Sequence, residues 1–86
     1  MKNRLEINRY GDKCWYLNDK LHRGDGPAIE DADGYKAWYL NGKCHRVDGP
    51  AIEWANGTKY WFLNGKLLDF KTQEEFEQYM KLKAFW

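Results

Sequence analysis

Serine is absent from this 86-residue chain, and its absence excludes a serine nucleophile outright. Cysteine occurs only twice, at Cys14 and Cys44, and the two positions are 30 residues apart. A disulfide framework is therefore not expected, and the reduced thiols of a cytoplasmic protein are the simpler interpretation.

Long apolar runs are also missing. The opening residues 1–12 lack the apolar stretch of a signal peptide, and no segment approaches the ~20 apolar residues that cross a bilayer. The net charge is only +1, which differs from the clustered positive charge of nucleic-acid-binding proteins. These absences favour a cytoplasmic localisation without a membrane partner, and they make nucleic acid a less favoured partner.

Aromatic residues, by contrast, make up 17% of the chain, with five Trp, six Tyr and four Phe. A domain of this size buries only about 60–65% of the surface of its unfolded chain. It can therefore carry more aromatic surface than its interior hides, and we expect the excess to meet a partner chain or a ligand.

An internal repeat of 23 residues accounts for most of the chain. Residues 15–37 and 38–60 agree at 16 of 23 positions, and Trp61 begins a third, truncated copy. A fixed period of this length predicts stacked or meandering units within a single domain over 1–86. Its segments are a partial repeat (1–14), repeat 1 (15–37), repeat 2 (38–60), a second partial repeat (61–68) and a C-terminal helix (72–83).

Each unit is predicted to form two short antiparallel strands joined by a tight turn. The first strand follows a Pro, in PAIED and PAIEW, and the second is aromatic, in KAWYL and KYWFL. Further hairpin turns are expected at Asn41-Gly42 and Asn64-Gly65, where both residues accept a positive φ. The predicted fold class is mostly β: an elongated antiparallel meander of about five or six strands capped by a C-terminal α-helix.

Alternation along the aromatic strand of each unit assigns two faces. The tryptophan face carries Trp15, Trp38 and Trp61. The tyrosine face carries Tyr16, Tyr39 and Phe62. Because both faces are apolar, one is expected to pack on the body of the domain, and the other needs a cover or serves as a binding surface.

Residues 72–83 have the pattern of an amphipathic helix. Thr72 and Glu75 form a capping box at its start. Three apolar residues follow at helical spacing, namely Phe76, Tyr79 and Met80. We expect this helix to cap the last repeat and to cover part of one sheet face. The apolar run 84–86 suggests the alternative of a partner-binding helix or a dimer contact.

The repeat also carries a recognisable frame, formed by Trp38, Asn41-Gly42, Lys43, His45, Gly49 and Gly57. This frame resembles the MORN repeat, and more closely a variant found in bacterial, phage and large-virus proteins. Arg46 departs from the pattern, since the usual repeat has Gly there. The resemblance implies hairpin units that scaffold or contact other proteins, without a shared reaction. A short protein that consists of such repeats alone resembles a phage product. This resemblance implies that the partner is a host enzyme or a defence component.

The segments His22-Arg23-x-Asp25 and His45-Arg46-x-Asp48 are the most prominent polar motifs. They predict either basic clefts for an anion, with Arg binding phosphate or carboxylate, or a structural loop in which Arg pairs with Asp. We favour the structural loop, because every unit must make the same bend.

Metal and covalent chemistry have little support. Cys44-His45, even together with His22 and Cys14, lacks the CxxC or HxxxH spacing of a zinc site. The chain also lacks a Gly-rich phosphate loop, and nothing marks a cysteine as activated. We therefore predict no metal, no cofactor, no catalytic residue and no enzyme activity.

The overall prediction is a non-enzymatic protein-binding module that occludes or scaffolds a partner protein. The predicted apolar contacts are Tyr16, Tyr39 and Phe62, with a polar rim of His22, Arg23, His45 and Arg46. One alternative is an RNA, DNA or nucleotide binder that uses aromatic rings and two lysine rows. The rows are Lys13, Lys36 and Lys59, and Lys20, Lys43 and Lys66. A homodimer is the other alternative.

Overall fold

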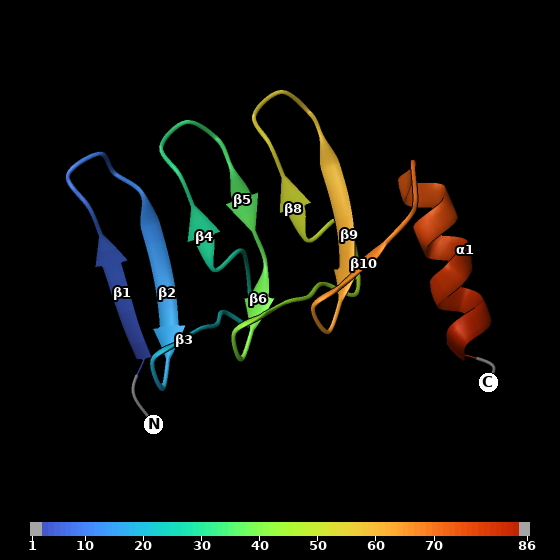
Figure 1. Ribbon diagram of the computed structural model, residues 1–86, viewed down its shortest axis with the longest axis horizontal. Coiled ribbons are helices and arrows are strands. Elements are labelled where there is room, and N and C mark those ends of the chain that lie inside the picture. The colour runs from blue at the N-terminus through green and yellow to red at the C-terminus, as the bar shows by residue number, and fades with distance from the viewer. Residues whose placement is uncertain (1–2, 85–86) are drawn as a thin grey trace.

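The structure, a computed structural model, describes residues 3–84, with ten short strands and one helix in that range (Figure 1). In chain order these are β1 (Asn3–Ile7), β2 (Lys13–Leu17), β3 (Lys20–Leu21), β4 (Ile29–Glu30), β5 (Lys36–Ala37), β6 (Tyr39–Leu40), β7 (Lys43–Cys44), β8 (Ile52–Glu53), β9 (Lys59–Leu63), β10 (Lys66–Leu68) and α1 (Gln73–Ala84). The predicted mostly-β meander with a C-terminal helix is therefore confirmed.

The strands form an antiparallel sheet of eight strands in the order β1-β2-β4-β5-β8-β9-β10, with β3 paired to β2. A separate hairpin is made by β6 and β7. More strands are present than the five or six expected, because the turn that begins with Asn18, Asn41 or Asn64 is itself a hairpin with a short return strand. These return strands are β3, β7 and β10.

The hairpin turns have the conformation that their sequences predict. Asn41 and Gly42 have φ values of 51° and 81°, and Asn64 and Gly65 repeat them at 51° and 81°. In the first copy Asn18 and Asp19 hold the same left-handed region at 52° and 64°, although a glycine is missing. Two consecutive positive φ angles match the twist of a two-residue hairpin, so all three turns are equivalent.

Helix α1 begins as the capping box predicts. The N–H of Glu75 donates to Thr72 Oγ1 over 3.2 Å, and the Glu75 carboxylate accepts from the N–H of Lys71 over 3.1 Å. Phe76, which is 1% exposed, packs its ring against Trp61 and Phe70, with centroids 6.4 and 6.0 Å away. The helix therefore caps the last repeat as expected, and it does so from the tryptophan face, which the sequence left open. The run at 85–86 lies outside the described residues, so its suggested contact role stays a prediction.

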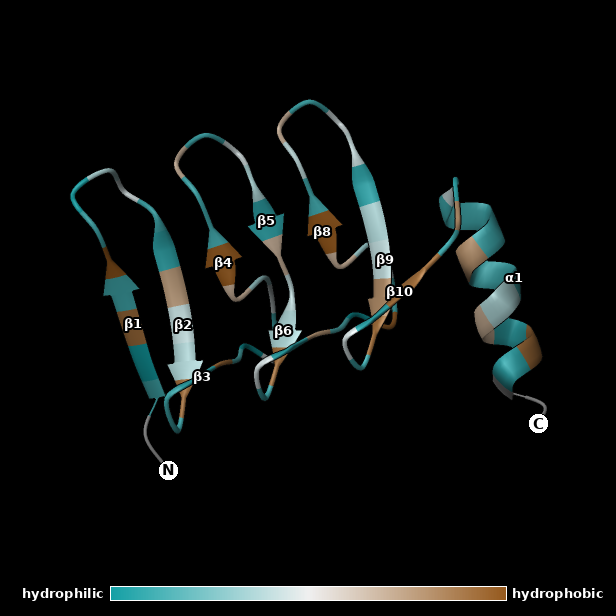
Figure 2. Cartoon of the chain, in the orientation of Figure 1, coloured by the Kyte–Doolittle hydropathy of each residue, from teal (hydrophilic) through white to brown (hydrophobic). Residues whose placement is uncertain are grey.

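The molecule is thin, and its apolar residues recur with the repeat (Figure 2). Its extents are 42 × 33 × 17 Å, and its radius of gyration is 13.7 Å, against about 12 Å for a compact chain of this length. The buried apolar residues are Ala28, Ala37, Cys44, Ala51, Trp61, Leu63 and Phe76. Only a single sheet layer with one helix at its end is available to bury side chains, so much aromatic surface stays exposed. In the described part of the chain, no helix has the length and hydrophobicity that a membrane span requires.

Candidate functional site

The tryptophan face is covered by the chain's own arginines. The Arg23 guanidinium lies 4.0 Å from the centre of the Trp15 ring, and Arg46 lies 3.9 Å from Trp38. Each Arg belongs to the segment that leads out of the hairpin, so this segment folds back over the tryptophan of its own unit. A cation stacked on an indole satisfies the ring's negative face while shielding it from water.

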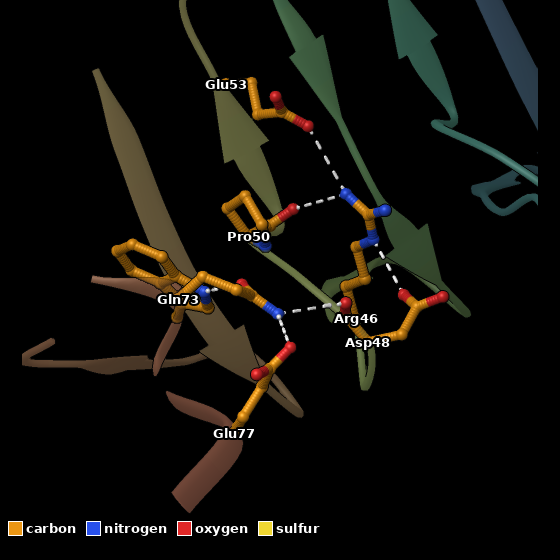
Figure 3. A network of polar contacts seen from close by, with 7 residues as sticks. Arg46, Asp48, Pro50, Glu53, Gln73 and Glu77 are labelled. Carbon is orange, nitrogen blue, oxygen red and sulfur yellow. Dashed lines mark hydrogen bonds and ion pairs between the residues drawn. The ribbon is translucent and has the colours of Figure 1, made fainter. Parts of the chain in front are cut away.

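The hydrogen bonds of Arg46 are also internal to its unit (Figure 3). Nε donates to Asp48 over 2.8 Å, while Nη1 donates to the Pro50 carbonyl at 3.0 Å and to Glu53 at 3.3 Å. Arg23 repeats this set with the equivalent residues of its own unit. The Arg46 side chain is only 22% exposed. With Nε and Nη1 already engaged, this geometry supports the structural interpretation of the His-Arg-x-Asp segment over an anion cleft.

A glycine leaves room for the stacked arginine. A side chain at Gly49 would place its Cβ 3.0 Å from the Arg46 guanidinium carbon, and Gly26 has the same relation to Arg23. This contact is tighter than ordinary van der Waals packing. A larger residue at Gly49 or Gly26 would therefore push the guanidinium away from the backbone, which gives a packing reason for the glycine of the DGP sequence.

The two histidines join consecutive units. His22 Nδ1 accepts a hydrogen bond from the N–H of Asn41 at 3.0 Å, and His45 Nδ1 accepts from Asn64 at 2.9 Å. Because an amide N–H can only donate, Nδ1 of each ring must be unprotonated. Each imidazole thus fixes the Asn-Gly turn of the next unit. An open groove of about 600 Å³ runs beside His45, lined by Trp38, Arg46, Val47 and the 24–27 loop.

Helix α1 takes over this covering role at the third tryptophan. The repeat position of Arg46 is occupied by Asp69 in the last copy, so no arginine can stack on Trp61. Instead Gln73 accepts a hydrogen bond from Trp61 Nε1 over 3.0 Å and donates to the Asp48 carbonyl over 3.3 Å. Phe76 packs beside them, and Trp61 is only 2% exposed.

Charges alternate across the tryptophan face. Cross-strand partners place the residues in one row in the order Lys13, Glu30, Lys36, Glu53 and Lys59. Each lysine of the first predicted row therefore has a glutamate opposite it. Opposite charges in register offset one another's field, so this row does not form the positive stripe that a phosphate backbone requires.

The tyrosine face has an apolar row in the corresponding position. Its members, again in cross-strand register, are Cys14, Ile29, Ala37, Ile52 and Tyr60. Beside it the predicted rings Tyr16, Tyr39 and Phe62 pair with Leu21, Cys44 and Leu67 of the return strands. Among the described residues, the helix and the arginine-bearing segments lie on the opposite face. This face is therefore one continuous apolar surface without a second layer.

Exposure identifies the most accessible part of the tyrosine face. Tyr16, Tyr39 and Phe62 are half-buried by their neighbours, whereas Trp54, Tyr60 and Leu67 are 48%, 43% and 54% exposed. The Trp54 ring packs on Tyr35 with centroids 4.5 Å apart. Desolvation raises the pKa of the Tyr16, Tyr35 and Tyr39 hydroxyls, as expected for phenols among apolar side chains.

Trp54 was missed as a candidate contact, although the sequence contains a signal for it. Residues that build the unit are the same in both copies. This position differs between them, because it is Asp31 in the first copy and Trp54 in the second. A large apolar side chain at a position that the repeat does not require points to a role outside the unit. The same reasoning applies to Tyr60, which corresponds to Ala37.

The predicted contact residues fall on two different surfaces. Tyr16, Tyr39 and Phe62 share the tyrosine face, whereas Arg23 and Arg46 lie over the indoles of the opposite face. His22 and His45 line grooves together with these arginines and tryptophans. The sheet separates the rings from the proposed polar rim, so the structure does not bring the two sets together.

The cysteines are poorly suited to covalent chemistry. Cys44 is 7% exposed, and burial raises the pKa of its thiol to about 11. Burial also raises the pKa of Cys14. A thiol is nucleophilic as its thiolate, which is scarce at neutral pH under these conditions. Within residues 3–84, no group of three or more His, Cys, Asp or Glu side chains is placed to hold a metal ion.

Comparisons of the chain with models of protein families, with curated proteins and with solved structures found no match.

Proposed function

We propose that this chain is a non-enzymatic protein-binding module whose contact surface is the tyrosine face. One observation carries the proposal: the tryptophan face is covered by arginines and by α1, while the tyrosine face has an unbroken apolar row and, among residues 3–84, no second layer. Large exposed apolar surfaces of this kind mark protein contacts. The resemblance to MORN repeats is consistent with such a role, in a cytoplasmic setting.

The chemistry of the face defines the partner. Its centre is the half-buried pair Ile29 and Ile52, which flank the fully buried Ala37, and the exposed aromatic rings of Trp54 and Tyr60 stand beside it. Charged side chains border it at the β1 edge, where Arg4 stacks 4.6 Å from the Tyr16 ring, and at Asp31, whose carboxylate lies near Cys14 and Tyr35. The matching partner is a protein with an apolar, uncharged patch. Binding then occludes that patch, with the aromatic rings as anchors.

Adjacent residues of β9 provide a matched test. Tyr60 belongs to the tyrosine face and Lys59 to the tryptophan face, and both are exposed. A photoreactive benzoylphenylalanine at position 60 is expected to cross-link the partner, and the same group at position 59 is not. Once the partner is identified by mass spectrometry, Tyr60→Ala should weaken its affinity by roughly tenfold or more, and Lys59→Ala should change it little. Equal cross-linking from both positions would contradict the proposal.

Nucleic-acid binding is the second candidate, and the lysines of the hairpin turns favour it. A Cβ at Gly42 or Gly65 would lie 3.7 Å from the Cβ of Lys20 or Lys43, so each lysine packs against the turn of the next unit and the lysines form a row. Lys66 continues the row. Phosphate binding along the row would fall steeply between low and moderate salt, whereas an aromatic protein contact would change little. Binding of a labelled single-stranded oligonucleotide at two salt concentrations, compared for wild type and Lys43→Gln, distinguishes the two functions.

A further inference from the structure

Strand β1 presents an unprotected sheet edge. Within residues 3–84 it pairs only with β2, and all five of its residues are exposed. Its Leu5 and Ile7 side chains are 46% and 57% exposed. Sheet edges are usually protected by charged side chains, proline, a bulge or shortness, and the two charges of β1, Arg4 and Glu6, are paired with each other. Here the sequence Asn3–Ile7 contains neither proline nor lysine, and its five residues equal the longest strands of the sheet.

The outward backbone groups of β1 follow from the hydrogen bonds of β2. Trp15 donates its N–H to the Ala28 carbonyl and accepts from His22 N–H, so both of its backbone groups point away from β1. Its cross-strand partner, Leu5, therefore occupies a non-hydrogen-bonded pair. The N–H and C=O of Leu5 consequently point outward from the sheet. Because strand geometry has a period of two, those of Asn3 and Ile7 do the same.

The side chains of β1 are self-complementary in one antiparallel register. Arg4 and Glu6 lie two residues apart on the tyrosine face and already form a 3.0 Å ion pair within the strand. If two copies of β1 meet with Leu5 opposite Leu5, each Arg4 lies opposite the second copy's Glu6. Moving the register by two residues either way puts Arg4 opposite Arg4 or Glu6 opposite Glu6. Like charges directly opposite one another are destabilising, so only the Leu5-centred register is complementary.

We propose that the chain forms a two-fold homodimer by antiparallel pairing of β1 with β1 of a second copy, with Leu5 on the axis. The outward groups of Asn3, Leu5 and Ile7 then exchange about six backbone hydrogen bonds. Arg4 and the second copy's Glu6 occupy non-hydrogen-bonded positions, where facing side chains lie closest. Both sheets continue into one, and the contact is isologous. The inference does not depend on the proposed function, because the contact is made along the β1 edge and leaves the apolar row from Cys14 to Tyr60 free.

The size of the contact predicts a weak dimer. Five residues of strand bury less surface than the roughly 1,200 Å² of a stable complex, so the dimer should dissociate on dilution. Sedimentation velocity over a roughly hundredfold concentration range should show the wild-type chain moving from monomer to dimer. A monomer at every concentration overturns the proposal.

Charge exchange tests the register itself. Arg4→Glu alone and Glu6→Arg alone each oppose like charges across the axis, so both variants should remain monomeric. Mixed in equal amounts they should form a heterodimer, visible by native mass spectrometry, because all four facing charges are then complementary. The double variant Arg4→Glu, Glu6→Arg should dimerise again. Lys81→Glu, on the exposed surface of α1, makes the same change in net charge as Arg4→Glu and should dimerise like wild type.

These variants distinguish β1 pairing from association through any other surface. Circular dichroism tests whether each single variant is folded. Both should be, because the exchanged charges are exposed, and the 3.1 Å ion pair with Asp19 that Arg4→Glu removes is a surface pair that contributes little stability. A dimer that persists in either single variant overturns the proposal, because association then uses a different face. Failure of the mixed variants to associate, when wild type does associate, overturns it as well.

Discussion

Histidine is present in the two units that are followed by another unit, whose turn donates a backbone N–H to the imidazole. Each imidazole accepts from the Asn-Gly turn of the next unit, and the equivalent residue of the last copy is Leu68. No further repeat follows Leu68, so an acceptor there would have no turn to hold. The presence and absence of histidine thus track the unit interfaces and need no ligand to explain them.

Replacing one histidine should weaken one interface by a defined amount. We expect His45→Leu to lower the free energy of unfolding by about 1 kcal/mol, since it removes the acceptor of the Asn64 N–H. His45→Asn should lose less, because its side-chain oxygen can occupy a place similar to that of Nδ1. Urea unfolding followed by fluorescence measures both. Equal losses in the two variants would show that the ring's packing, and not its acceptor, stabilises the interface.

At the scale of elements, three equivalent tryptophans are covered in two different ways. Trp15 and Trp38 each lie under an arginine, whereas Trp61 lies under Gln73 and Phe76 of α1. The helix is therefore a substitute for the arginine-bearing segment at the place where the repeat ends. This substitution leaves the tyrosine face open along the whole sheet, which is the basis of the proposed function.

The helix should be stabilised mainly by one side chain. Phe76→Ala removes a ring that is 1% exposed and leaves a cavity against Trp61, so we expect a loss of about 3–5 kcal/mol. Leu82→Ala, on the same helix but 62% exposed, should change stability by no more than about 0.5 kcal/mol. Thermal or urea unfolding provides the comparison. Similar small effects for both would contradict the capping role of α1.

Structural features that depend on neighbouring residues were predictable from the sequence. Contacts between segments that are distant in the sequence were less predictable. The Asn-Gly turns and the Thr72–Glu75 capping box depend on neighbouring residues, and both form as expected. The stacking of Arg46 on Trp38 depends on how a segment folds back over the sheet. Nothing in the spacing of these residues fixes that path. The alternation of Lys36 with Glu30 and Glu53 likewise required the strand register.

The whole molecule is a short array in which one interface is made twice. Gly42 N–H donates to Leu21 O and Arg23 N–H to Tyr39 O between the first pair of units. The same bonds recur 23 residues later, from Gly65 to Cys44 and from Arg46 to Phe62. Because units contact only their neighbours, the stability of such an array is approximately a sum of units and interfaces. Its length is therefore set by the number of units and not by the demands of a closed core.

An added unit should consequently fold in place. We expect insertion of a second copy of residues 38–60 between Tyr60 and Trp61 to give a soluble protein with three interfaces between units in place of two. Its thermal unfolding midpoint should be higher than that of the wild-type chain. Two more strands should lengthen the sheet by about 10 Å, which small-angle scattering detects. A matched insertion carrying His45→Leu and Arg46→Ala in the inserted copy should gain less stability, because it lacks the acceptor and the stacked guanidinium. If the unaltered insertion lowers the midpoint, or unfolds independently of the rest, the units are not the additive blocks that their repeated contacts indicate.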